Sequence, residues 1–193
     1  YIMDYQDREF KIVAKTSLGL EDVLEQEIKE LGISKIEKGN RAITFYTNKK
    51  NLYKANLKLR TANRLLMPIK SFTIKTVDDL YNQIKKIKWY DIFNVDQTFA
   101  IDSTVFSPLF NHTQFAAFKS KDAIVDLFRD KFGKRPDIDK DFPHIRINIH
   151  INKLNEVTVS LDSSGDPLFK RGYRDSRSIA PIKEDLAAGL VLL

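Results

Sequence analysis

The sequence predicts an α+β fold in which a small sheet with two helices is followed by a second unit of mixed strands and helices. Three observations support this prediction. Strand-like runs of alternating apolar residues lie between segments whose apolar residues recur at helical spacing. The chain has 193 residues, 42% of them hydrophobic, which suffices for one large or two small cores. The first six elements follow the order βαββαβ, which suits a ferredoxin-like sheet with both helices on one face.

The first strand and helix have clear boundaries. Residues 11–15 read as a short strand, and apolar spacing predicts a helix from about Leu20 to Leu31. Glu21 and Asp22 lie in its first turn, where the helix dipole favours acids, and Gly32 ends it.

Turn and cap residues set the next elements. Strands are expected at 35–37 and 42–46, joined across Gly39-Asn40, because both residues tolerate positive φ. Asn48 is positioned to cap a second helix, and residues 65–75 read as extended. These elements complete the βαββαβ order.

The second unit is predicted to begin with a helix and end with a hairpin. Thr76 and Asp79 have the spacing of a capping box, with Asp in place of the usual Glu. A strand is expected from Thr98 to Phe106. A long helix follows from about Thr113 to Phe132. Strict alternation over 145–151 and 157–161 predicts an antiparallel hairpin.

Aromatic residues in this unit are interpreted mainly as packing residues. Phe118, Val125 and Phe128 are expected along one side of the long helix, together with Lys121. The single Trp, Trp89, is expected to be a packing anchor between the two halves, and stacking on a nucleobase is its alternative role.

Charge favours a polyanionic partner. The net charge is +6, and the 40 residues between Glu37 and Asp78 contain no acid. The alternative is a solvated basic surface that keeps the protein soluble. No run of eighteen apolar residues occurs, which excludes a transmembrane helix, and without cysteine there are no disulfides or thiol sites. We expect a cytoplasmic protein.

The residues offer no complete catalytic constellation. The three histidines, His112, His144 and His150, have no metal-binding spacing, and the seven glycines are dispersed, so no glycine-rich phosphate loop is present. No cofactor or metal site is therefore expected in this chain, and the chain alone is expected not to be an enzyme.

Several strings resemble one family over nearly the whole chain. They are LDSSGDPLFKRGYR at 161–174, APIKEDLAA at 180–188, WYDIFN at 89–94, KSKDAIVD at 119–126, RPDID at 135–139 and IRIN at 145–148. They resemble bacterial 23S rRNA guanine-N2 methyltransferases, in which an N-terminal RNA-binding region with a THUMP domain precedes a Rossmann-like catalytic domain. The helix that begins at APIKE, residues 180–184, distinguishes this family from the THUMP-containing thiouridine synthetases and pseudouridine synthases.

The resemblance implies three segments. An N-terminal ferredoxin-like subdomain would cover 1–75, with a THUMP profile beginning near residue 52. The α/β THUMP core would cover 76–172, and 173–193 would be a linker and the first helix of the missing Rossmann-like domain. The apolar run from Leu186 to Leu193 has no partner after it, which suggests a fragment.

Clustered cations are the candidate RNA contacts, because Lys and Arg bind phosphates and release counterions. The candidates are Lys119, Lys121, Arg146, Lys170, Arg171, Arg174 and Arg177. Each has the alternative of pairing with a nearby acid. By the resemblance, Pro181, Lys183 and Glu184 would face the catalytic domain or its cofactor side.

The resemblance also implies the partners and the cofactor. The partners would be structured RNA, in particular 23S rRNA, and the protein's own catalytic domain, with no membrane. S-adenosylmethionine would serve the missing domain. Three alternatives remain: a protein-interaction or assembly domain, the RNA-binding part of another THUMP RNA-modification enzyme, and an independent enzyme acting on a small ligand.

Overall fold

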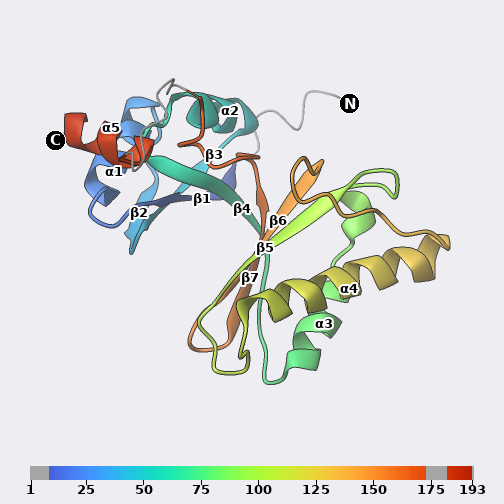
Figure 1. Ribbon diagram of the computed structural model, residues 1–193. Coiled ribbons are helices and arrows are strands. Elements are labelled where there is room, and N and C mark those ends of the chain that lie inside the picture. Colours follow the sequence, from blue (N-terminus) through green and yellow to red (C-terminus); the bar gives the residue numbers. More distant parts are fainter. Residues whose placement is uncertain (1–8, 173–181, 193) are drawn as a thin grey trace. The chain divides into compact units, whose positions relative to one another are not determined.

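The computed structural model describes residues 9–172 and 182–192, and their contacts divide them into two compact units (Figure 1). Unit 1 contains the described residues up to Met67 and those from Ser163 onward. Unit 2 spans Pro68–Asp162. The domain boundaries expected from the sequence stay predictions.

Unit 1 has the βαββαβ order. Its elements are β1 (Phe10–Thr16), α1 (Glu21–Glu30), β2 (Ile36–Gly39), β3 (Ala42–Thr47), α2 (Lys49–Lys58) and the first part of β4 (Ala62–Thr73). The strand order is β2-β3-β1-β4, and the β1–β3, β2–β3 and β1–β4 pairs are all antiparallel. This topology confirms the predicted ferredoxin-like subdomain and, with unit 2, the α+β class.

Local hydrogen bonds explain the ends of these elements. The Asn48 side chain accepts a hydrogen bond from the backbone N–H of Asn51 at 3.0 Å, which confirms the predicted cap of α2. The β2–β3 reversal is displaced by one residue from the prediction. Gly39 pairs with Ala42 inside the ladder, so Asn40 and Arg41 form the turn and Arg41 takes the positive φ of 54°.

Two described segments that follow Asp162 pack on the rest of unit 1. The backbone N–H of Ser163 donates to the carbonyl of Leu65 at 3.0 Å, and that of Leu168 donates to Asn63 at 2.8 Å. Farther along, α5 (Glu184–Leu192) buries Asp185, whose carboxylate accepts a hydrogen bond from Ser17 Oγ at 2.7 Å. Both segments are therefore held by specific polar contacts.

Unit 2 combines a βαβ crossover with an antiparallel hairpin. After β4 come α3 (Val77–Lys85), the short 3₁₀ helix η1 (Trp89–Asp91), β5 (Phe99–Val105), α4 (Thr113–Phe132), β6 (Ile145–Ile151) and β7 (Glu156–Asp162). The strand order is β4-β7-β6-β5, with β5 parallel to β6 and β6 antiparallel to β7. Helices α3 and α4 pack side by side, and α4 also contacts β5 (Figure 1).

The boundaries and core of unit 2 follow the sequence closely. Thr76 and Asp79 form the predicted capping box, and Gly133 ends α4 with φ 67°. Trp89 is fully buried within the core of unit 2, and its indole N–H donates to the carbonyl of Ile84 at 2.9 Å. Trp89 is therefore a packing residue, but the prediction that it anchors one half to the other is wrong, because its whole core cluster belongs to unit 2. Its full burial excludes the alternative of base stacking.

One side of α4 is divided between core and surface. Val125 and Phe128 are buried, whereas Phe118, on the same predicted side, is 50% exposed. Since Phe118 lies near the start of the helix, beside the edge strand β5, the sheet does not extend far enough to cover it. The exposed ring lines a hollow at the edge of β5.

Candidate nucleic-acid interface

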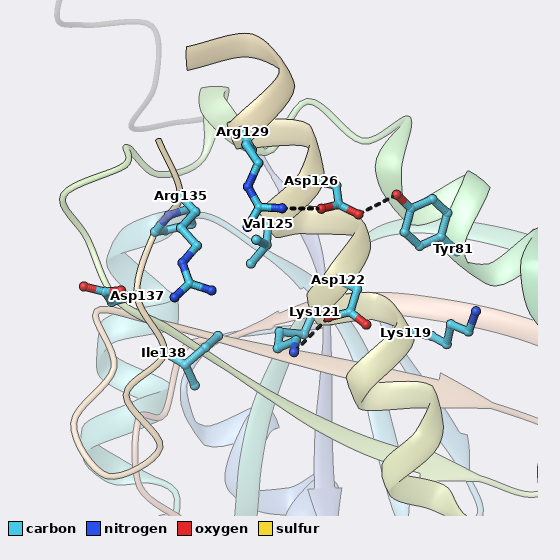
Figure 2. A pocket seen from close by; sticks show the side chains of 11 residues that line it. Tyr81, Lys119, Lys121, Asp122, Val125, Asp126, Arg129, Arg135, Asp137 and Ile138 are labelled. Atoms are coloured by element: carbon cyan, nitrogen blue, oxygen red, sulfur yellow. Dashed lines mark hydrogen bonds and ion pairs between the residues drawn. The ribbon is translucent and has the colours of Figure 1, made fainter. Parts of the chain in front are cut away.

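A hollow of about 590 Å³ lies beside α4, at the residues shown in Figure 2. One wall comes from α4, and the others come from Tyr81 of α3 and from the segment that follows Gly133. The lining residues are Tyr81, Lys119, Lys121, Asp122, Val125, Asp126, Arg129, Arg135, Pro136, Asp137 and Ile138. Four cations and three acids therefore share this hollow.

A second hollow of about 370 Å³ adjoins the first, because Lys121 and Ile138 line both. It lies against the edge of β5 and the first turns of α4. Its lining residues are Ala100, Ile101, Asp102, Ser103, Thr113, Gln114, Ala117, Phe118, Lys121, Ile138, Lys140 and Arg146. We call the two hollows together the α4 groove.

Three of the groove cations are partly neutralised by aspartates from α3 or α4. Lys121 Nζ lies 2.8 Å from Asp122, and Lys119 Nζ lies 3.4 Å from Asp78. Arg129 lies 3.3 Å from a carboxylate oxygen of Asp126. Such surface pairs contribute at most about 1 kcal/mol each, so a stronger anion can displace the carboxylate at small cost.

Asp126 also holds α3 to α4. Its second oxygen accepts a hydrogen bond from the Tyr81 hydroxyl at 2.8 Å (Figure 2). Burial first, and then this hydrogen bond, raises the pKa of Tyr81, so its hydroxyl stays a neutral donor at physiological pH. This pair fixes the wall of the groove.

Arg146 is the most enclosed cation of the groove, with its side chain 11% exposed. It lies 3.4 Å from Asp102, and one of its terminal nitrogens donates to the carbonyl of Lys140 at 3.0 Å. Its Nε is buried and finds no partner among the described residues. The guanidinium is thus rigidly placed with one donor unused.

Arg135 and Lys140 differ from the other groove cations. Both are exposed, and within residues 9–172 and 182–192 neither forms an ion pair. Figure 2 shows the Arg135 guanidinium and the Lys121 side chain extending toward the same space from opposite walls. Among the described residues, Arg135 and Lys140 are therefore the groove cations that no carboxylate neutralises.

The structure brings three of the predicted RNA contacts together. Lys119, Lys121 and Arg146 all line the α4 groove in unit 2. Lys170 and Arg171 belong to unit 1. Arg174, Arg177 and Pro181 lie outside the described residues. Their roles as RNA contacts, or in the case of Pro181 as an interdomain residue, remain predictions.

Arg171 has a structural role in unit 1. One of its terminal nitrogens donates to the carbonyls of Asn56 and Leu59, each at 2.7 Å, and so satisfies carbonyls at the end of α2. Lys183 Nζ lies 5.9 Å from the centre of the Phe169 ring, and Glu184 is the first residue of α5. The predicted interdomain role of Lys183 and Glu184 remains untested.

Sequence reasoning missed Arg129, Arg135, Lys140 and Phe118 as members of the groove. Arg129 lies in a helix whose charges recur regularly, so the sequence does not distinguish it from other surface charges. Arg135 and Lys140 lie in an irregular segment, where no periodicity indicates which way a side chain points. A usable signal was the pair Arg135-Pro136 directly after the helix stop at Gly133, because a rigid turn places its neighbours at a helix end.

In the part of the chain that the structure describes, no three His, Cys, Asp or Glu side chains are grouped so as to hold a metal ion. No described helix is both long and apolar enough to cross a bilayer.

Two domain families match the chain in succession. Residues 11–66 match the RlmL ferredoxin-like domain, and residues 75–162 match the THUMP domain. All residues of the α4 groove fall within the second match.

Longer proteins are similar over nearly the whole chain. A ribosomal RNA large subunit methyltransferase K/L of Marinomonas sp. (strain MWYL1) is 42% identical over 175 residues, which are 91% of this chain and 24% of that protein. The chain thus spans about a quarter of the length of this relative.

Solved structures share the fold. One, described as a predicted N6-adenine-specific DNA methylase from Listeria monocytogenes, has a TM-score of 0.81 and 29% identity over 96% of this chain and 48% of its own. SMU.472, assigned as a methyltransferase and solved with SAH, has a TM-score of 0.80 and 27% identity over the same shares. These proteins are all described as methyltransferases or methylases. The Marinomonas name specifies ribosomal RNA, the Listeria name specifies DNA, and the SMU.472 name specifies no nucleic acid.

Proposed function

Because this chain belongs to the family in which an RlmL ferredoxin-like domain precedes a THUMP domain, we propose that it is the RNA-holding region of an rRNA methyltransferase. The RNA is structured 23S rRNA, and the whole protein transfers a methyl group from S-adenosylmethionine to the exocyclic amine of a guanine. The observation that carries the proposal is the α4 groove, which gathers six cations on one side of the THUMP domain.

The groove cations suit a phosphate backbone. Arg135 and Lys140 are exposed and without acidic partners among the described residues, so each can bind a phosphate directly. Lys119 and Lys121 would exchange an aspartate for a phosphate, which costs little for exposed pairs. Such contacts position an RNA stem by its shape and backbone and leave base chemistry to another domain.

Unit 1 supplies a second set of candidate contacts. Lys170 and Arg171 extend the basic stretch of the chain, and Arg174 and Arg177 follow them in sequence. Arg171 uses one terminal nitrogen for the α2 carbonyls, which leaves its other donors for a phosphate. Lys183 and Glu184 would face the catalytic part of the protein.

We assign S-adenosylmethionine to the part of the protein outside this chain. The seven glycines are dispersed, so they form no glycine-rich loop of the kind that approaches a nucleotide cofactor closely. Bound there, the cofactor would supply the methyl group. The chain's own task is to hold the RNA so that one guanine can leave its stack and reach that domain.

A salt titration tests the proposal. Binding of a structured 23S rRNA segment should weaken steeply with salt, with a log–log slope of about −0.7 to −0.9 per phosphate contacted. Double-stranded DNA of matched length should bind more weakly, because the groove is expected to fit an A-form backbone. A slope near zero would instead favour a protein-interaction domain, whose lysines are already satisfied by aspartates such as Asp78 and Asp122.

A further inference from the structure

The second hollow of the α4 groove has two apolar walls. Phe118 of α4 is 50% exposed, and Ile138 of the segment after α4 is 42% exposed. Half-exposed large apolar side chains are common singly, but here two of them line one hollow of about 370 Å³. A flat apolar group that enters this hollow would be partly desolvated by these side chains.

The third wall is the open edge of β5. Phe99 donates its N–H to Asp137 at 3.1 Å and accepts from the N–H of Asp139 at 3.2 Å, on the side away from β6. Backbone direction alternates along a strand, so Ile101 and Ser103 direct their N–H and carbonyl groups to that same side. Both residues line the hollow, which therefore receives backbone donors and acceptors in one row.

Cations surround this hollow. Lys121 borders it from α4, Lys140 from the opposite segment, and Arg146 from β6, with the unused Nε described above. One carboxylate, that of Asp102, accompanies Arg146. Three positive groups thus lie close to the apolar walls and to the strand edge.

Few ligands match all three features. A lipid chain would leave the strand edge and the cations without polar partners. A free phosphate or sugar phosphate would leave Phe118 and Ile138 exposed to water. A nucleotide matches all of them, since its base has two apolar faces and a hydrogen-bonding edge and its backbone carries the anion. The volume lies in the range of about 300–1,000 Å³ found for small-molecule pockets.

We propose that this hollow binds one unstacked nucleobase of an RNA strand, with its face on Phe118 and its flanking phosphates on Lys121 and Lys140. The inference rests on the proposed function and makes it more specific. Bases inside an A-form stem are stacked and cannot enter. The preferred ligand is therefore RNA in which a paired stem adjoins an unpaired nucleotide.

Two RNAs test the inference. One is a blunt, fully paired RNA duplex, and the other is the same stem closed by a single-stranded loop that contains the fluorescent base 2-aminopurine. Phe118→Ala should weaken binding of the looped RNA about 5- to 150-fold, the range expected for loss of one base–aromatic stack. It should leave the affinity for the paired duplex unchanged and abolish the fluorescence change that binding causes in the looped RNA.

The controls separate this inference from its premise. Phe142→Ala removes a ring that is 84% exposed and lines neither hollow, so it should have no effect. Phe118→Tyr keeps a stacking face and should retain binding. If Phe118→Ala leaves both affinities unchanged, or lowers both equally, the base site is wrong while RNA binding stands. If the unsubstituted chain binds neither RNA, the proposed function fails and the base site with it.

Discussion

Arg171 shows how an arginine that the sequence assigns to RNA can also have a structural role. Its guanidinium reaches two backbone carbonyls at the end of α2, those of Asn56 and Leu59. We predict that Arg171→Lys lowers the free energy of unfolding by about 1 kcal/mol, because lysine keeps the charge but loses the planar donor geometry. Urea denaturation measures this. Lys170→Arg, the neighbouring control, should be neutral, and equal stability of both variants would refute the structural role.

Glu27 is a buried acid within an otherwise apolar helix face. Only 6% exposed, it accepts hydrogen bonds from the backbone N–H groups of Arg60 and Thr61 at 3.1 and 3.0 Å. We predict that Glu27→Gln lowers the free energy of unfolding by about 1–3 kcal/mol, because the amide nitrogen would face donors. Glu30→Gln, on the exposed end of the same helix, is the matched control in thermal denaturation. A Glu27→Gln variant as stable as this control would contradict the prediction.

Asp79 caps α3, so the protonation state of this one side chain affects the stability of a whole helix. Hydrogen bonds from the backbone N–H of Lys75 first, and then from that of Thr76, lower the pKa of Asp79 below its ordinary 3.8. A lowered folded pKa means that the stabilisation is present above pH 3.8 and is lost as the pH falls through the folded value.

The pH dependence of α3 follows from this cap. At neutral pH Asp79→Asn should have a lower melting temperature than the unsubstituted chain, and the two should converge in acid. Thr76→Ala should cost about 1 kcal/mol at neutral pH, because its hydroxyl accepts the backbone N–H of Asp79. A difference for Asp79→Asn that persists undiminished at low pH would argue against the carboxylate as the cap.

Helix α5 docks on unit 1 through its smallest residue. A Cβ added to Gly189 would overlap the side chain of Leu20 at Cδ2 and lie 3.0 Å from its Cδ1. Leu20 is itself buried, so it has little room to move. Gly189→Ala, normally favourable in a helix by about 1 kcal/mol, should therefore loosen α5.

Amide hydrogen exchange measures this docking directly. The amides of α5 should exchange faster in Gly189→Ala than in the unsubstituted chain. Leu190→Ala changes a neighbouring side chain that is 60% exposed and should leave the exchange rates near their original values. Unchanged exchange in Gly189→Ala would mean that Leu20 does not clamp the helix.

Among the elements, the helices whose ends carry a capping side chain or a left-handed glycine were predictable. Asn48, Thr76 and Gly133 mark helix ends by hydrogen bonding or positive φ, and all three act as expected. The β2–β3 turn was not placed correctly, because the ladder registers Gly39 with Ala42 and moves the turn onto Arg41. The position of this turn is set by the pairing of β2 with β3, which the conformational preferences of Gly39 and Asn40 do not reveal.

At the scale of the whole molecule, the fold was easier to predict than the site. Lys119, Lys121 and Arg146 meet because a βαβ crossover packs α4 against β5, which pairs with β6, although the sequence alone did not show that they share a groove. Arg135 and Lys140 lie in an irregular segment, so only the tertiary structure reveals that they face α4. Phe118 was identified as a helix residue, but its exposure depends on where the sheet ends.

The most direct test of the α4 groove is the salt dependence of RNA binding after removal of its charges. The substituted chain carries Lys121→Gln, Arg135→Gln and Lys140→Gln. The control carries Lys86→Gln, Lys88→Gln and Lys153→Gln, three exposed lysines of the same unit that line neither hollow. The groove variant should bind a structured 23S rRNA segment more weakly, and its log–log salt slope should be shallower by about 2–3, close to one phosphate per cation. A control variant that loses as much affinity and slope as the groove variant would contradict the account.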